Sequence, residues 1–128
     1  MKRRVMIDLE TTALTPERGE ILRLYARDLN DSTSTFDQLV KPKRPLSKLV
    51  QQITGITNEV VRNAPSLEAA MPEFLDFIDG ATLQSTAIDF DMGFLNKSFR
   101  MIWLSEILRL QLVELCCCCG CTKIFCRT

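Results

Sequence analysis

Apolar and polar residues alternate along the first forty residues in a way that predicts three β-strands. The first strand is expected over residues 3–9 (RRVMIDL), the second over residues 20–28 (EILRLYARD) and the third over residues 33–40 (TSTFDQLV). Residues 30–32 (NDS) are typical of a turn, because their short polar side chains bond to nearby backbone groups. We therefore expect the second and third strands to form an antiparallel hairpin.

After residue 40 the spacing of apolar residues becomes helical. Residues 41–47 (KPKRPLS) form a basic, proline-containing loop, and apolar residues at helical or turn spacing follow it. Ser66 is the expected N-cap of a helix over residues 67–79, which Gly80 ends. Pro72 inside this helix predicts either a kink or a helix that begins one turn later.

A further strand and a further helix complete the pattern. Residues 81–88 (ATLQSTAI) predict a weak fourth strand, and residues 91–101 (DMGFLNKSFRM) predict a helix that turns Met92, Leu95 and Phe99 toward the sheet. The order of elements predicts an α/β domain, in which three antiparallel strands are followed by a parallel strand and helices flank the sheet.

Length and composition limit the classes of protein that fit. A chain of 128 residues is long enough for one hydrophobic core but too short for two. Its 16 basic and 16 acidic residues cancel, so contact with nucleic acid must rest on a local patch. No apolar run reaches the roughly 18 residues of a membrane span, and the N-terminus lacks the pattern of a signal peptide. We therefore expect a cytoplasmic protein without membrane contact.

All six cysteines lie between residues 116 and 126, in the sequence CCCCGCTKIFC. A disulfide framework spreads its cysteines across the fold to close loops, which this cluster cannot do. Cys116 and Cys119 match the C-x-x-C spacing of a zinc site, but the chain has no histidine and no second pair at a suitable separation. We expect one domain over residues 1–100 and an atypical cysteine-rich tail over residues 101–128, with a zinc or thiol module in the tail as the alternative.

Three carboxylates stand out by their positions. Asp8 and Glu10 lie at the end of the first strand, and because side chains alternate across a strand they point the same way, about 7 Å apart. Two ionised carboxylates repel one another unless a cation lies between them, so this spacing favours a divalent metal site. Asp91 begins the last helix and faces the pair if the first and fourth strands are neighbours. The alternatives are a solvated strand edge for the pair and a helix N-cap for Asp91.

Four segments resemble one known family. They are VMIDLETTALTPERGEI, FDQLVKPKRPLS, QQITGITNEVVRNAPSLEAAMPEFLDFIDG and DFDMGFLNKSF, which are similar in order and spacing to the DnaQ-like (DEDD) 3′-5′ exonucleases. That family includes the proofreading exonucleases of bacterial replicative polymerases. The resemblance covers about the first hundred residues, and it implies the ribonuclease-H-like fold, a mixed sheet with flanking helices that is here incomplete at the C-terminus.

The resemblance implies a catalytic metal site. Asp8, Glu10 and Asp91 match the family's metal ligands and catalytic residues. Two ions of Mg²⁺ or Mn²⁺ are implied: one lowers the pKa of an attacking water, and the other, about 3.5–4 Å away, stabilises the leaving 3′ oxygen.

The resemblance also implies a substrate and partners. Thr11, Thr12 and Leu14 match the positions that cradle the terminal nucleotide, and Ile56 matches the position against the terminal base. The implied substrate is a single-stranded 3′ end of DNA, with RNA left open, in proofreading or DNA repair. A DNA polymerase or a helicase is implied as parent protein or partner, and a free-standing exonuclease is the alternative.

The chain also departs from the family pattern. Thr86 and Ala87 replace the His-Asn pair that usually precedes the second-motif aspartate. The third motif, with its fourth carboxylate and its His or Tyr base, is missing, because the 37 residues after Asp91 contain no Asp and no His. We interpret the chain as a truncated copy that leaves its original reading frame at about residue 110. The alternative function is an inactive remnant that binds metal or nucleic acid weakly.

Overall fold

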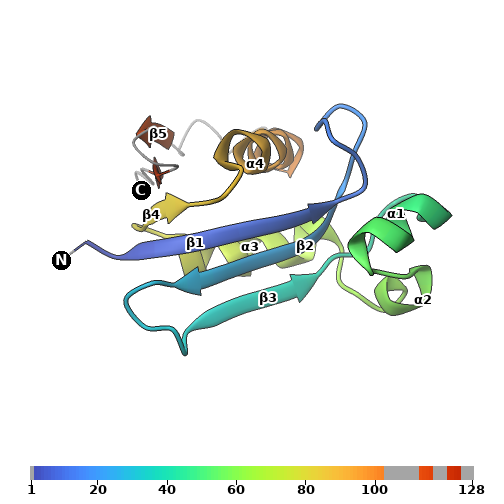
Figure 1. Ribbon diagram of the computed structural model, residues 1–128, viewed down its shortest axis with the longest axis horizontal. Helices are drawn as coiled ribbons and strands as arrows, with labels where there is room; N and C mark the ends of the chain where they lie inside the picture. Colours follow the sequence, from blue (N-terminus) through green and yellow to red (C-terminus); the bar gives the residue numbers. More distant parts are fainter. Residues whose placement is uncertain (1, 103–112, 117–120, 125–128) are drawn as a thin grey trace.

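The computed structural model describes residues 2–102, 113–116 and 121–124 of the chain (Figure 1). Its strands are β1 (Arg4–Thr11), β2 (Ile21–Asp28), β3 (Thr35–Leu39), β4 (Thr82–Gln84), β5 (Val113–Cys116) and β6 (Cys121–Ile124). Its helices are α1 (Lys48–Thr54), α2 (Asn58–Val61), α3 (Leu67–Ile78) and α4 (Ile88–Ile102).

The strands form one mixed sheet in the order β3-β2-β1-β4-β6-β5. Strand β1 pairs antiparallel with β2, and β2 pairs antiparallel with β3. Strand β4 runs parallel to β1 on its other side. The predicted hairpin and the predicted parallel fourth strand are therefore confirmed, and β1 lies at the centre of the predicted part of the sheet.

Two short strands of the C-terminal segment extend the sheet beyond β4, which the sequence pattern did not predict. Strand β6 pairs antiparallel with β4, and β5 pairs antiparallel with β6. Residues 103–112, 117–120 and 125–128 lie outside the described residues. The predictions of a changed reading frame and of a zinc module fall largely on those residues and stay predictions.

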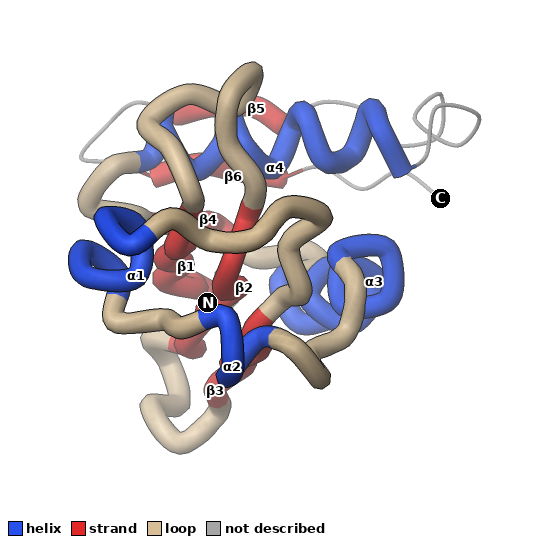
Figure 2. Tube along the Cα trace, turned by 90° about the vertical axis from the view of Figure 1, so that its right-hand side faces the viewer, coloured by secondary structure: helices blue, strands red, loops and turns tan. Residues whose placement is uncertain are grey.

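The main core forms where the inward side chains of β1 meet α3 and α4. Val5, Ile7 and Leu9 alternate along β1 and are buried in one cluster with Phe74 of α3 and Leu95 of α4. Helix α3 lies behind the strands in Figure 1, and Figure 2 shows α3 and α4 as separate helices beside the sheet. Since residues two apart on a strand share a face, the even-numbered side chains of β1 point away from this core.

A second, smaller core fixes the segment that contains α1 and α2. Leu22 of β2 and Leu46, both buried, pack there with Ile56. Asn58 holds the segment together, because its side-chain amide accepts from the Leu46 N–H at 2.7 Å and donates to the Leu46 carbonyl at 3.0 Å. Gly55 ends α1 at φ 72°, a left-handed conformation that glycine adopts without a steric cost.

Helix α3 begins at Leu67 after the Ser66 cap, as predicted, and the exposed Pro72 lies inside it, so the alternative of a start one turn later is wrong. The bounds of the fourth strand and of the last helix differ from the prediction. Strand β4 ends at Gln84, since residues 85–87 turn toward α4, and α4 begins at Ile88 rather than at Asp91. None of the helices in the described ranges is long and apolar enough to cross a membrane.

Asp28 joins the start of β1, the end of β2 and the turn that follows. Its carboxylate accepts hydrogen bonds from Arg3 Nε at 2.7 Å, from the Asn30 N–H at 2.8 Å and from the Asp31 N–H at 3.3 Å. The hydrogen bond from Arg3 and then the bond from the Asn30 N–H hold the pKa of Asp28 below its ordinary value. Arg3 also donates a hydrogen bond to the Phe77 carbonyl, so the Arg3–Asp28 pair connects the sheet to α3.

We predict that Asp28→Asn lowers the free energy of unfolding at pH 7 and that its difference from the wild type shrinks in acid. A carboxyl group with a depressed folded-state pKa stabilises the fold above its ordinary pKa, and this contribution is lost as the pH falls through the folded-state value. Urea denaturation at pH 7 and at about pH 3 measures both differences. Asp76→Asn on α3 is the control, and an Asp28→Asn deficit of equal size at both pH values would contradict the prediction.

Candidate active site

Asp8 and Glu10 project from the face of β1 that points away from the core. The residues on both sides of Asp8 are buried, whereas Asp8 is exposed and Glu10 is half-buried. The strand continues to Thr11, so both acids lie within β1 rather than after its end. On β2, Tyr25 is the register partner of Asp8, and Arg23 is the register partner of Glu10.

Asp91 reaches the same region from α4. Because β4 runs parallel to β1, the turn after Gln84 places the start of α4 near β1. The Asp91 side chain is only 2% exposed, and one of its oxygens, Oδ2, accepts a hydrogen bond from Ser85 Oγ. The Ala87 N–H donates to the same hydroxyl at 3.0 Å, so the turn between β4 and α4 holds Ser85 against Asp91. Asp91 itself lies within α4 and is not its N-cap.

The three carboxylates act on one another electrostatically. Burial raises the pKa of Asp91 to about 6; the hydrogen bond from Ser85 opposes this rise, and the charges of Asp8 and Glu10 add to it. Burial also raises the pKa of Glu10, with a further contribution from the charge of Asp8. The charges of Asp8 and Glu10 therefore reach Asp91, while burial has the larger effect on its pKa.

Arg23 is the nearest described counter-charge on β2. Its guanidinium group binds both oxygens of Asp37 on β3, at 2.8 Å from Nε and 2.7 Å from Nη2, and lies 5.2 Å from the centre of the Tyr25 ring. The charge of Arg23 lowers the pKa of Glu10, against the larger effects of burial and of Asp8. Arg23 thus neutralises part of the negative charge while it is itself held by Asp37.

The chemistry of these residues fits a hard divalent cation, which binds carboxylate oxygens in preference to nitrogen or sulfur. Within residues 2–102 and the two short described strands, no three Asp, Glu, His or Cys side chains are gathered into a formed metal-binding group. Asp91 is turned toward Ser85, and Glu10 lies opposite Arg23. Carboxylate oxygens are thus the type of ligand atom that such a cation prefers. In the present arrangement Asp91 accepts a hydrogen bond from Ser85, and Glu10 feels the charge of Arg23 on the neighbouring strand.

The last residue of β1 and the loop that follows it contain the residues predicted to cradle a nucleotide. The Thr11 hydroxyl donates to the Ala13 carbonyl at 2.8 Å, and the Thr12 hydroxyl accepts from the Glu20 N–H at 2.8 Å. Both hydroxyls therefore shape the loop. Leu14 is 86% exposed, so its apolar side chain is open to a binding partner.

Ile56 lies in the turn between α1 and α2 and is only 8% exposed. Its side chain belongs to the small core under these helices. The large exposed apolar side chains of this region are instead Leu49 and Ile53 on α1 and Val60 on α2. Ile56 is thus placed to position α1 and α2, and its predicted contact with a base stays a prediction.

Sequence reasoning missed two members of this site, Ser85 and Arg23. Ser85 stands in the segment predicted as the fourth strand, and the break of that strand after Gln84 turns its hydroxyl to Asp91. Arg23 belongs to an alternating strand, and only the register of β1 with β2 places it opposite Glu10. A signal for Ser85 existed, because Ser is favoured in turns that precede a helix.

We predict that the metal-free chain becomes more stable as the pH falls from 7 to 5. Asp91 has a pKa of about 6 in the fold against an ordinary value of 3.8, so in this window the folded state binds a proton that the unfolded state does not bind. Asp91→Asn should flatten this dependence and raise the free energy of unfolding at pH 7 by about 2 kcal/mol.

Urea denaturation in EDTA at pH 5, 6 and 7 measures this dependence. Asp89→Asn is the matched control, because Asp89 is exposed in the first turn of the same helix and should leave the slope unchanged. A slope in Asp91→Asn equal to that of the wild type would show that another group causes the dependence.

Comparison with known proteins places this arrangement in a family. The chain matches a family model described as Exonuclease (RNase_T) over residues 5–117. A DNA polymerase III PolC-type of Thermotoga petrophila is 33% identical over 109 residues, which are 84% of this chain and 8% of the relative. The DNA polymerase III PolC-type of Latilactobacillus sakei is 37% identical over 97 residues, which are 74% of this chain and 7% of the relative. The chain therefore spans less than about a tenth of the length of these relatives.

Solved exonuclease structures share the fold. The nuclease domain of 3′hExo, a DEDDh family member bound to rAMP, aligns with a TM-score of 0.68 and 24% identity, covering 78% of this chain and 59% of that chain. A full-length 3′-exonuclease aligns with a TM-score of 0.64 and 25% identity, covering 88% of this chain and 41% of that chain. From the family match, the relatives and the shared ribonuclease-H-like fold, we conclude that this chain belongs to the DnaQ-like 3′-5′ exonuclease family.

Proposed function

We propose that this chain forms a 3′-5′ exonuclease domain that hydrolyses phosphodiester bonds at a single-stranded 3′ end of DNA. The observation that carries the proposal is the charge cluster of Asp8, Glu10 and Asp91, in which the pKa of Asp91 is raised to about 6. A buried and repelled carboxylate costs folding free energy, and such costs concentrate at sites that use the charge. Membership of the exonuclease family supports nuclease chemistry at this cluster.

We further propose that Asp8, Glu10 and Asp91 hold two ions of Mg²⁺ or Mn²⁺. When bound, these ions would supply a lowered pKa for the attacking water and charge stabilisation for the leaving 3′ oxygen. The carboxyl group of Asp91 must be ionised to act as a ligand, so ion binding opposes its protonation. Ser85 donates to Oδ2 of Asp91 and orients the carboxylate, as a partner behind a metal ligand does.

Other residues of the chain would position the strand end. Leu14 is exposed beside the end of β1 and would contact a base through its apolar side chain. Since the hydroxyls of Thr11 and Thr12 are engaged within the loop, these residues would contribute backbone contacts to the terminal nucleotide. Ile56 would act by holding α1 and α2 in place. RNA is the alternative substrate.

The relatives suggest the setting of this activity. Both reported relatives are named DNA polymerase III PolC-type, and this chain aligns with 7–8% of their length. We propose a replicative DNA polymerase as parent or partner and proofreading as the process. A helicase partner and a role in DNA repair are the alternatives.

A second candidate function is favoured by one observation. In the described part of the chain no three metal-binding side chains form a group. This observation favours a remnant that binds metal or a nucleic-acid end weakly. The remnant predicts metal binding without turnover, whereas the exonuclease predicts both.

We predict that the chain releases 3′ nucleotides from a 5′-labelled single strand in Mn²⁺ and that Asp8→Ala lowers the rate at least about 1,000-fold, because a lost ligand removes transition-state charge stabilisation. Denaturing gel electrophoresis of timed samples measures the rate. Asp89→Asn, an exposed carboxylate two residues from Asp91, is the control and should retain the wild-type rate within about twofold. Absence of turnover in a folded wild-type sample would reject the exonuclease in favour of the remnant.

We also predict that Mn²⁺ raises the melting temperature of the wild type by several degrees, because a ligand that binds only the folded state stabilises it. Asp8→Ala and Asp91→Asn should lose most of this shift, and Asp89→Asn should keep it. Differential scanning fluorimetry with a Mn²⁺ titration measures the shift. An undiminished shift in both variants would place the ion outside the carboxylate cluster.

A further inference from the structure

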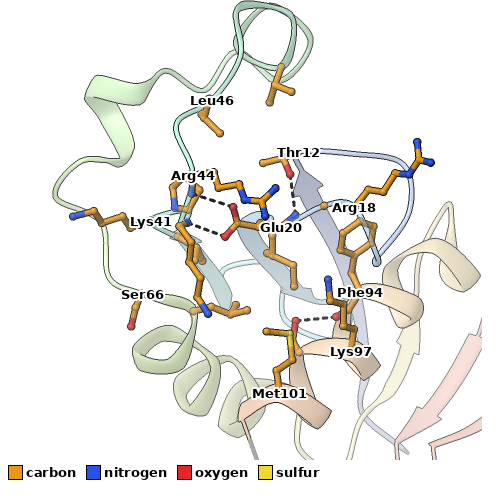
Figure 3. A pocket seen from close by; sticks show the side chains of 18 of the residues that line it. Thr12, Arg18, Glu20, Lys41, Arg44, Leu46, Ser66, Phe94, Lys97 and Met101 are labelled. Atoms are coloured by element: carbon orange, nitrogen blue, oxygen red, sulfur yellow. Dashed lines mark hydrogen bonds between the residues drawn. The ribbon is translucent and has the colours of Figure 1, made fainter.

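A cleft of about 910 Å³ opens beside the end of β1, on the side where α3 and α4 meet the loops (Figure 3). Its walls are the β1–β2 loop, the segment between β3 and α1, the first turn of α3 and the second half of α4. Asp8, Glu10, Asp91 and Leu14 do not line it, whereas Thr12 does. The cleft is therefore separate from the carboxylate cluster but begins at the same strand end.

Hydrogen bonds between the loops hold the cleft open. The carboxylate of Glu20 accepts from the backbone N–H of Lys43 at 2.8 Å and of Arg44 at 3.3 Å, which joins the two loops (Figure 3). The Lys41 N–H donates to the Pro65 carbonyl at 2.8 Å. Lys97 of α4 donates to the Pro16 carbonyl across the other wall. The cavity is thus built into the fold.

Close packing also sets the position of the β1–β2 loop. A Cβ atom at Gly19 would lie 3.0 Å from the Ala13 backbone nitrogen and 3.1 Å from Cε1 of Phe94. A side chain at this position would require its neighbours to shift by a few tenths of an ångström, so glycine favours this close approach of the loop to α4. The loop and α4 therefore form one continuous wall.

The floor of the cleft is apolar. Ile21, Val40, Leu46 and Phe94 line it and are buried. Met101, at the end of α4 that borders the cleft, is 60% exposed (Figure 3). The apolar surface open to a ligand belongs to the half-buried Val50, Leu67 and Ile102 and to the exposed Met101, which lie over these buried side chains. A flat, weakly polar group that entered the cleft would exchange water for this surface.

The rim of the cleft is cationic. Five basic and three acidic residues line it: Arg18, Lys41, Lys43, Arg44 and Lys97, with Glu17, Glu20 and Glu68.

Two of the acids are already engaged. Glu20 binds the loop backbone, and Glu68 lies 3.7 Å from Nζ of Lys43. Within the part of the chain that the structure describes, the side chains of Arg18, Lys41 and Arg44 form no ion pair. In a chain of zero net charge, this local excess of positive charge favours an anionic ligand.

We propose that this cleft binds a nucleotide, with its phosphate on Lys41 and Arg44 and its base against the apolar side chains of the cleft. The preference for an anion rests on the cleft alone, whereas the choice of a nucleotide rests on the proposed function. A nucleotide has two parts that complement the cleft: a phosphate that basic side chains bind and a flat ring that apolar side chains contact. The nucleotide is either part of the DNA strand or a free nucleoside monophosphate.

Binding without turnover separates this proposal from the proposed function. A fluorescein-labelled oligo-dT of ten nucleotides is titrated with the full chain in EDTA, and fluorescence anisotropy gives the dissociation constant. The double variant K41Q/R44Q should weaken binding at least about tenfold, since it removes two phosphate contacts.

Arg62→Gln is the matched control, because Arg62 is an exposed cation outside the cleft and should bind within about twofold of the wild type. Met101→Glu is a second test at an exposed position and should also weaken binding, by adding a negative charge at the rim. Circular dichroism confirms that each variant is folded. Wild-type affinity in both K41Q/R44Q and Met101→Glu, or an equal loss in Arg62→Gln, would overturn the proposal.

Competition identifies the source of the nucleotide. If thymidine 5′-monophosphate displaces the labelled strand at millimolar concentration and inorganic phosphate does not, the cleft takes a free nucleotide. If only unlabelled oligo-dT displaces it, the cleft takes a nucleotide of the strand. Equal displacement by inorganic phosphate and by the mononucleotide would overturn the role of the base and the apolar floor.

Discussion

Strand β1 has one face that must be buried and one face that bears charged side chains, and the rest of the structure depends on this division. Its inward side chains Val5, Ile7 and Leu9 must be buried, because they hold α3 and α4 to the sheet. Its outward side chains Asp8 and Glu10 carry charge. The strict alternation of a strand allows both on one segment, and a shift of register by one residue would bury the acids and expose the core.

The charge cluster is held against its own repulsion by the packing around it. Phe94 and Leu95 anchor α4 in the core, and this anchoring keeps Asp91 buried near two other carboxylates. Ser85 offsets part of the cost with one hydrogen bond, and Arg23 offsets part with its charge. A fold that maintains such a cluster without a cation is less stable at neutral pH than it would be with neutral side chains, which is the usual compromise of a site shaped for ligand binding.

The loop that follows β1 connects the strand that carries Asp8 and Glu10 to the basic cleft. Thr12 lines the cleft, and its hydroxyl accepts the Glu20 N–H that fixes the loop. Glu20 in turn holds the backbone of Lys43 and Arg44. One chain of hydrogen bonds therefore links the residue that follows β1 to the loop that carries the cations.

Local pattern determined much of this protein. Alternation along residues 3–40, the Ser66 cap and the D-x-E spacing of Asp8 and Glu10 each depend on neighbours in the chain, so the sequence by itself predicted β1, β2, β3, α3 and the acidic pair. Three features were decided only by tertiary structure. They are the short β4 that frees Ser85 to reach Asp91, the register that sets Arg23 opposite Glu10, and the cleft between loops that are far apart in sequence. Each depends on contacts between distant segments, whose geometry follows from packing and strand pairing and leaves no periodic trace in the order of the residues.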